Sequence, residues 1–213
     1  MLRLRIRFCR GDEVKFISHL DIMRLWHRAL NRAGMPLAYS EGFNPHPRLS
    51  LAAPLALGIT SEAELVDVYT QAPMSPHAFI AMVTPHLPAG LEVSQVSLVS
   101  PALPSLQSQL RFAEYEVRLP AESEAQVSLA IASLMEKKSL PWSHQRDTGM
   151  RCYDLRPLID ALWLIGYEDG IARITMRLRC DASGAGRPEQ VARALGLNAP
   201  LEIRRTKLIL KAG

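Results

Sequence analysis

The chain has 213 residues, a length that suits one large domain or two small ones, and we expect two domains of about 100 residues each. A content of 48% hydrophobic and 22% charged residues excludes an intrinsically disordered chain. The net charge is +4, and the basic residues lie towards both ends, because residues 49–110 contain no Lys or Arg. This distribution favours a polyanionic partner, although an arginine-rich surface without such a partner would show it as well.

The sequence predicts a cytoplasmic protein without a membrane segment. Its apolar runs are far shorter than the roughly 20 residues that span a bilayer, and its N-terminus alternates charged and apolar residues, unlike a signal peptide. The three cysteines, Cys9, Cys152 and Cys180, are too far apart for a CxxC metal knuckle, and their odd number does not indicate a disulfide framework.

The first half is predicted to run strand, helix, strand, strand, helix, strand. The ranges are 2–8, 18–34, 49–57, 63–70, 75–86 and 91–99. The stretch "LRLRIRF" alternates apolar and basic residues with the period of a half-buried strand. Ser18 suits the start of the first helix, with Asp21 in the capping-box position, and Gly34 suits its end. This element order is the ferredoxin-like pattern.

The second half is predicted to repeat that order after the stretch "SPALPSLQSQ", which has the composition of a linker. The predicted strands and helices cover 110–119, 122–138, 151–156, 161–167, 171–180, 187–195 and 201–210. Within it, "RPLIDALWLI" fits less well and is also compatible with a partly helical segment. The sequence thus predicts an α+β protein of two tandem ferredoxin-like domains with antiparallel sheets, an N-terminal domain at 1–100, a linker at 101–109 and a C-terminal domain at 110–213.

Rows of arginines are the first candidate for a binding surface. On the two alternating strands they are Arg3, Arg5 and Arg7, and Arg173, Arg177 and Arg179; on the first helix they include Arg24 and Arg28. Arginine binds phosphate bidentately and stacks on bases, so a sheet face of this kind suits single-stranded or looped RNA. The alternative is that these charges merely keep strand faces polar and prevent edge aggregation. Few aromatic residues are interleaved, so base stacking of the RRM type is not indicated.

The stretch "YSEGFNPHPRLSLA" is the second candidate. Its glycine and asparagine permit unusual backbone angles, and its two prolines stiffen the chain. A stiff loop can hold Tyr39, Asn44, His46 and Arg48 in fixed positions beside a sheet, as in a preorganised binding site. A structural crossover between helix and strand would use some of the same residues but needs neither His46 nor Arg48.

Catalytic chemistry is indicated only by two histidines, His19 and His46. The loop that carries His46 follows the helix that begins near His19 and could fold back over it. A lone histidine is more often structural, and neither helical metal spacings nor nucleophile motifs are present. The CxxxCxxC site of a radical-SAM enzyme is absent too. We therefore expect no metal and no cofactor, and regard enzymatic activity as the lesser alternative.

Residues 16–68, "FISHLDIMRLWHRALNRAGMPLAYSEGFNPHPRLSLAAPLALGITSEAELVDV", closely resemble the radical-SAM-associated family known as DUF2344. Members carry an F-x-SHLD-x-MR helix, then YS-x-GFNPHP, then a G-x-x-S-x-x-E strand segment. The resemblance implies a partner or extension of B12-binding radical-SAM proteins and an association with RNA or translation. In place of a phenylalanine-bearing "ISFA" strand this chain has "LSLAAPLALG", which is equally apolar.

Three functions follow as hypotheses. The first is an RNA-binding accessory protein that presents RNA to a radical-SAM partner, with the arginines above contacting phosphates and the loop providing selectivity. The second is a metal-independent endoribonuclease in which His19 or His46 takes a proton from a ribose 2′-hydroxyl. The third is a protein-only adaptor whose arginines meet an acidic surface of the radical-SAM partner.

Overall fold

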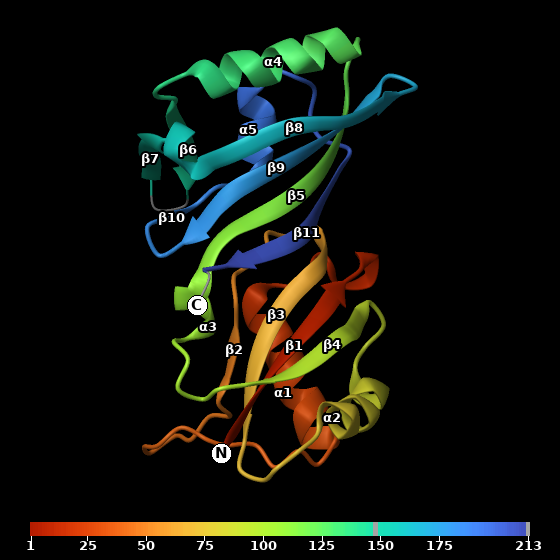
Figure 1. Cartoon of the computed structure of the whole chain (residues 1–213), viewed down its shortest axis with the longest axis vertical. Helices are drawn as coiled ribbons and strands as arrows, with labels where there is room; N and C mark the ends of the chain where they lie inside the picture. Colours follow the sequence, from red (N-terminus) through yellow and green to blue (C-terminus); the bar gives the residue numbers. More distant parts are fainter. Residues whose placement is uncertain (147–148, 212–213) are drawn as a thin grey trace. The chain divides into compact units, whose positions relative to one another are not determined.

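The computed structural model describes residues 1–146 and 149–211, and the chain forms two compact units, Met1–Leu110 and Arg111–Gly213 (Figure 1). Positions 147–148 and 212–213 of the predicted C-terminal domain lie outside the described residues. Each unit combines helices with an antiparallel sheet, which confirms the α+β class. None of the described helices has the length and apolarity needed to cross a membrane.

The first unit has a four-stranded antiparallel sheet in the order β2-β3-β1-β4. Its elements are β1 (Leu2–Arg10), α1 (His19–Arg32), β2 (Leu49–Leu51), β3 (Thr60–Thr70), α2 (Pro76–Val83) and β4 (Leu91–Val99), with short 3₁₀ turns at Asp12–Val14 and Thr84–His86. Leu4, Ile6 and Phe8 of β1 are fully buried, as the alternation predicts. Trp26 of α1 packs edge-on against Phe8, with ring centroids 5.0 Å apart, so α1 closes the core of this unit.

The ends of α1 follow its sequence signals. The Ser18 hydroxyl accepts a hydrogen bond from the backbone N–H of Asp21, which satisfies one of the unpaired donors of the first turn. After the helix, Gly34 adopts a φ of 64°, a left-handed conformation that glycine reaches without strain. The strand expected at 49–57 is shorter, because β2 ends at Leu51 and Pro54 lacks the N–H needed to continue a ladder.

The stretch predicted as a linker is bound to the first unit. It forms a short helix, α3 (Leu106–Gln109), and the side chain of Leu106 is fully buried. The Gln107 amide donates to the backbone carbonyl of Leu51 at 2.7 Å. Arg3 donates to the carbonyls of Leu103 and Pro104 at 2.7 and 2.9 Å. The uncharged composition of this segment predicts a linker, but the carbonyls of Leu103 and Pro104 accept hydrogen bonds from the buried Arg3.

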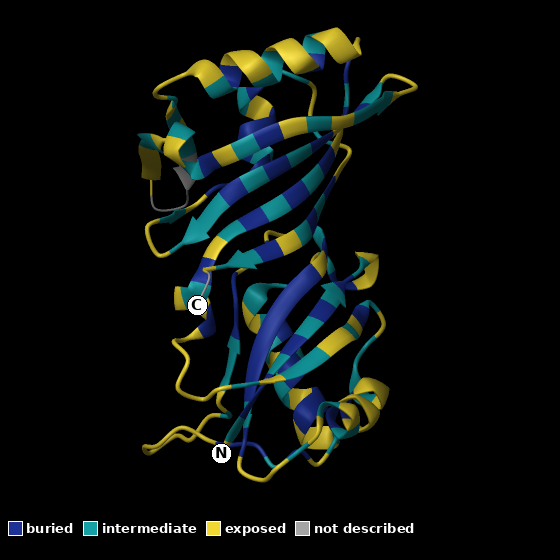
Figure 2. Ribbon diagram, in the orientation of Figure 1, coloured by how far each residue is buried: buried dark blue, intermediate teal, exposed yellow. Residues whose placement is uncertain are grey.

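The second unit has a four-stranded order β8-β9-β5-β11 and a separate hairpin. Its elements are β5 (Leu110–Pro120), α4 (Glu124–Glu136), β6 (Pro141–Arg146), β7 (Gly149–Asp154), β8 (Ile159–Glu168), β9 (Ile171–Asp181), β10 (Gly184–Ala185), α5 (Pro188–Ala194) and β11 (Glu202–Leu210). Buried and less buried residues alternate along β5 and β9, as Figure 2 shows. Strand β6 was not predicted, and the ambiguous segment is helical only as a 3₁₀ turn over Arg156–Leu158.

Candidate nucleic-acid interface

Two arginines of the β1 row are bonded to one buried carboxylate. The Nε and Nη2 atoms of Arg3 donate to Asp67 Oδ2 at 2.8 and 2.6 Å, and those of Arg5 donate to Oδ1 and Oδ2 at 2.9 and 3.0 Å. Arg3 is 1% exposed and Asp67 is fully buried. The register explains the pairing, because Arg5 lies directly opposite Asp67 on β3. This finding differs from the expectation that Arg3 and Arg5 face a phosphate.

Arg7 is the member of the row that lies farthest along β1, opposite Leu65 of β3 and Gln95 of β4. It is half-buried, and its charge acts on the neighbouring Cys9. Burial nevertheless raises the pKa of the Cys9 thiol, and the carboxylate of Glu92 raises it further. The thiol is therefore neutral at ordinary pH and unsuited to act as a nucleophile.

The arginines of α1 are exposed. Arg24 pairs with Asp21 at 2.8 Å, and the Ser18 hydroxyl together with Arg24 lowers the pKa of that carboxyl. Arg28 lies one turn further on, and with Arg32 it lines a groove of about 410 Å³ against residues 85–88. This helix face thus keeps positive charge at the surface, as its spacing predicts.

The structure places His19 and His46 at opposite ends of α1. His19 is the first residue of this helix, which is 14 residues long, or roughly 21 Å. His46 lies beyond its C-terminal end, in a loop whose Arg48 contacts the sulfur of Met1 at 3.3 Å. The loop therefore lies beside the start of β1, whereas α1 begins after the end of β1. The expectation that the loop folds back over the N-terminal end of α1 is thus wrong. The nuclease alternative therefore concerns either His19 or His46 alone and not the two histidines acting together.

The loop that carries His46, residues 39–48, is a hairpin that projects from the first unit (Figure 1). The backbone N–H of Ser40 donates to the carbonyl of His46 at 2.8 Å, and the N–H of His46 donates to the Ser40 hydroxyl at 3.0 Å. The N–H of Arg48 donates to the carbonyl of Ala38 at 2.7 Å. At the turn, Gly42 has a φ of 122°, a region that side chains strongly disfavour.

An exposed aromatic ring stands at the tip of this loop. Phe43 is 107% exposed and Tyr39 is 44% exposed. Asn44, His46 and Arg48 are exposed too, so all four predicted loop residues share this element with Phe43. Phe43 was missed because the sequence was read for polar groups; the available signal was an aromatic residue inside a polar turn, where no apolar periodicity would bury it.

Arg48 is held at the base of the loop by an aromatic ring. Its guanidinium carbon lies 4.6 Å from the ring centroid of Tyr69 on β3, a distance typical of a cation–π contact. The guanidinium carbon of Arg3 lies 5.5 Å from the same centroid. Arg3 is buried and bonded to Asp67, whereas Arg48 is exposed. Arg48 therefore presents its charge to solvent from a fixed position beside the loop.

The arginines of β9 in the second unit have different environments. Arg177 is paired with Glu114 at 2.8 Å and with Asp160 at 3.7 Å, so acids on neighbouring strands neutralise it. Arg173 is exposed at the opposite end of the row. Arg179 donates to the Ser183 hydroxyl at 3.3 Å and lies 3.7 Å from the carboxylate of Asp181. The row is thus a set of local pairs and not one continuous basic face.

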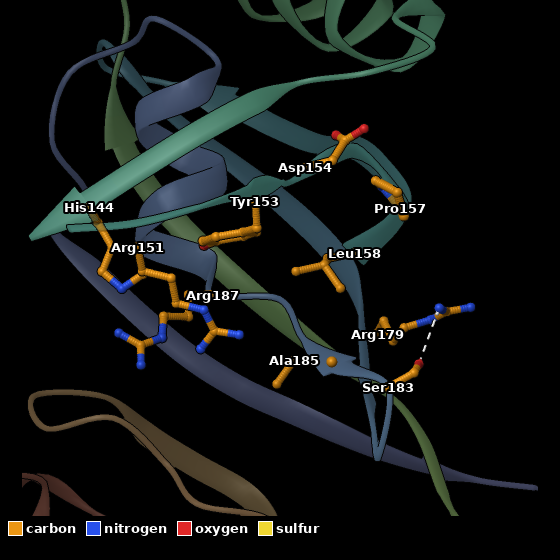
Figure 3. A pocket seen from close by; sticks show the side chains of 11 residues that line it. His144, Arg151, Tyr153, Asp154, Pro157, Leu158, Arg179, Ser183, Ala185 and Arg187 are labelled. Atoms are coloured by element: carbon orange, nitrogen blue, oxygen red, sulfur yellow. Dashed lines mark hydrogen bonds between the residues drawn. The ribbon is translucent and has the colours of Figure 1, made fainter. Parts of the chain in front are cut away.

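Arg179 also lines a pocket of about 370 Å³ in the second unit (Figure 3). The β6–β7 hairpin and the turn before α5 form this pocket. Its charged and aromatic lining residues include His144, Arg151, Tyr153, Arg179 and Arg187. Four of these were not predicted as site residues: His144, Arg151, Tyr153 and Arg187. The signal was weak, since the hairpin has no clear apolar alternation and the turn "SGAGR" matches no phosphate-binding motif.

The described residues contain no group of three His, Cys, Asp or Glu side chains arranged to hold a metal ion.

Comparison with known proteins identifies a family and a fold. A family model described as "Uncharacterized protein conserved in bacteria (DUF2344)" matches residues 3–188. No curated protein matches the chain. Among solved structures, a chain of a Cbf5-Nop10-Gar1 complex is similar with a TM-score of 0.53 at 10% identity, covering 96% of this chain. A chain of an archaeal box H/ACA sRNP Nop10-Cbf5 complex gives a TM-score of 0.48 at 9% identity, with 95% of this chain covered. This chain spans about half the length of either structure, 48% and 46% respectively, and likeness at such identity concerns the fold alone.

Proposed function

The chain belongs to the DUF2344 family, and on this premise we propose that it is an RNA-binding accessory protein that works with a B12-binding radical-SAM enzyme. The observation that carries the RNA-binding part is the projecting loop 39–48, which combines an exposed phenylalanine with amide, imidazole and guanidinium groups. The radical-SAM partner comes from the family resemblance, and a role in RNA modification or translation-related processing accompanies it.

The loop has the chemistry that single-stranded RNA requires. The ring of Phe43 offers a face on which a base can stack, worth about 1–3 kcal/mol per base. Asn44 can read the edge of an unpaired base, and Arg48 can hold the adjoining phosphate bidentately. Because the prolines and the hydrogen bonds between Ser40 and His46 restrict the backbone, less conformational entropy is lost on binding than for an unstructured loop.

The arginines that we propose to contact RNA phosphates differ from those expected from the sequence. We propose that Arg48, together with Arg24 and Arg28 on α1, contacts the RNA backbone in the first unit. Arg3 and Arg5 hold Asp67 and the segment 100–109 instead. Arg7 stays a secondary candidate, since it is half-buried. In the second unit, Arg173 is exposed, whereas Arg177 is half-buried and held by two acids, and Arg179 is half-buried beside Asp181.

We also propose that each unit is a ferredoxin-like domain. The element order strand, helix, strand, strand, helix, strand, with the first and third strands adjacent at the centre, supports this for the first unit. The second unit has the equivalent order, with the β6–β7 hairpin inserted after its first helix. The proposed boundary lies near residue 110, because the segment 100–109 belongs with the first unit.

RNA binding is tested by fluorescence anisotropy with labelled single-stranded and hairpin RNAs. The wild type is compared with Phe43→Ala and Arg48→Gln, and with Leu129→Ala, which removes another exposed apolar side chain, 72% exposed, from the second unit. We expect Phe43→Ala to weaken binding about tenfold, since it removes one stacking contact. Arg48→Gln should weaken binding and also reduce its dependence on salt between about 50 and 200 mM. Unchanged affinity in both loop variants would refute the proposal.

The partner is tested separately by affinity capture of the radical-SAM protein, with and without nuclease treatment. Capture that nuclease treatment abolishes supports an accessory protein that presents RNA. Capture that survives the nuclease and is unaffected by Phe43→Ala indicates the protein-only adaptor instead. Gel analysis of the RNA recovered from the anisotropy samples decides on the nuclease alternative, for which we expect intact RNA.

A further inference from the structure

We propose that the pocket between the β6–β7 hairpin and the turn before α5 binds a phosphate monoester carried by a nucleotide. The pocket belongs to the second unit, and the proposal does not depend on RNA binding by loop 39–48. We call it the hairpin pocket; His144, Arg151, Tyr153, Leu158, Arg179 and Arg187 line it.

Two arginines converge in the hairpin pocket without an acidic partner. Arg151 and Arg187 are exposed, and within the described residues neither guanidinium group takes part in a hydrogen bond or an ion pair. The guanidinium carbon of Arg151 lies 5.6 Å from the ring centroid of Tyr153. Figure 3 shows both side chains reaching into the same side of the pocket, below the ring of Tyr153. Two guanidinium groups directed at one place repel each other, and a bound anion would turn that repulsion into attraction.

Among the described residues, Asp154 of the pocket lining and the nearby Asp181 form no ion pair with Arg151 or Arg187. The carboxylate of Asp154 accepts hydrogen bonds from the backbone N–H groups of Leu140 and Arg156 at 2.8 and 2.9 Å, and it lies across the pocket from Arg151 (Figure 3). Asp181 accepts a hydrogen bond from the N–H of Ser183 at 2.8 Å and lies near Arg179 instead. The charge left available to a ligand is therefore positive and sits at the Arg151 side.

The size and walls of the pocket point to a nucleotide and not to a bare inorganic ion. A volume of about 370 Å³ falls among the roughly 300–1,000 Å³ of small-molecule sites. Leu158, Pro157 and Ala185 give it apolar walls, while Arg151 and Arg187 could hold a phosphate bidentately. The ring of Tyr153 is fixed because its hydroxyl is hydrogen-bonded to Gln190 of α5. A fixed aromatic ring beside a phosphate site suits the base or sugar of a nucleotide.

The same chemistry could come from a free nucleotide or from the 5′-phosphorylated end of an RNA. Isothermal titration calorimetry on the full chain separates these sources with adenosine 5′-monophosphate, adenosine, inorganic phosphate, and one short RNA with or without a 5′-phosphate. We expect the monophosphate or the phosphorylated RNA to bind at least about tenfold more tightly than its counterpart without phosphate. Binding of the phosphorylated RNA alone identifies an RNA end, and binding of the mononucleotide identifies a free nucleotide.

Arg151→Gln and Arg187→Gln are each expected to weaken binding of the phosphorylated ligand about tenfold, because each removes a charged hydrogen bond. Arg193→Gln is the matched control, an exposed arginine of α5 outside the pocket, and should leave the affinity unchanged. Equal affinity for ligands with and without phosphate, or equal loss in Arg193→Gln, would overturn the proposal. So would inorganic phosphate binding as tightly as every nucleotide. Phe43→Ala should bind the phosphorylated mononucleotide normally, so the two proposals can fail separately.

Discussion

The substitution Asp67→Asn tests whether Arg3 and Arg5 are structural. In the folded chain Asp67 accepts four hydrogen bonds from these two guanidinium groups, at 2.6 to 3.0 Å, and it is fully buried. Asparagine keeps the shape but removes the charge, which leaves the 1%-exposed Arg3 cation without a counterion. Breaking a buried ion pair on one side costs about 3–5 kcal/mol, so we expect a loss of this size in the free energy of unfolding.

Urea unfolding followed by tryptophan fluorescence measures this loss. Trp26 is buried in the first unit, so a Trp142→Phe/Trp163→Phe background makes the signal specific to that unit. The control substitution is Glu202→Gln, which breaks the exposed pair with Arg118 at 3.1 Å and should cost at most about 1 kcal/mol. Unfolding of this control variant is followed by the fluorescence of Trp142 and Trp163, which are both retained in it. If Asp67→Asn costs no more than the control, the structural role given to Arg3 and Arg5 is wrong.

Two further substitutions test the first unit. Ser18→Ala removes the N-cap of α1 and should lower the free energy of unfolding, measured in urea, by about 1 kcal/mol. The same substitution should raise the pKa of Asp21 towards its ordinary value, because the Ser18 hydroxyl is the main cause of its lowering. An NMR titration measures this pKa. Since that pKa is lowered on folding, the carboxylate stabilises the fold above its ordinary pKa, and this contribution is lost as the pH falls through the lowered value. Leu106→Ala should lower the free energy of unfolding by about 2–5 kcal/mol, and Leu103→Ala should lower it much less, because Leu103 is partly exposed. Equal and small losses in the two variants would show that the segment 100–109 is a free linker.

Local patterns in the sequence were sufficient to predict most strands and helices. The alternation of β1, the Ser18 cap and the Gly34 exit all depend on neighbouring residues, and each occurs in the structure as expected. Strand β6 was missed because "PWSHQR" begins with proline and lacks the alternation of a half-buried strand. Its pairing with β7 is what makes it a strand.

The candidate site was less predictable, because contacts between distant residues decide it. The alternation of the sequence showed that Arg3 and Arg5 share a face of β1, but it could not show that Asp67 of β3 lies on the same face of the sheet. The hairpin pocket likewise combines Arg151 with Arg187, which are on separate elements that only folding brings together. The loop was easier to recognise, since the prolines that restrict its backbone and the glycine that permits its turn lie within ten residues of sequence.

Ultraviolet cross-linking of the full chain to a short single-stranded RNA, with the linked peptides mapped by mass spectrometry, tests the central claim most directly. We expect cross-links within loop 39–48, above all at Phe43, whose exposed ring is placed to stack on a base. Phe43→Ala should remove them, while a chain carrying Leu129→Ala should retain them. Cross-links that map to β1 and spare the loop, or cross-links that persist unchanged in Phe43→Ala, would contradict RNA binding by this loop.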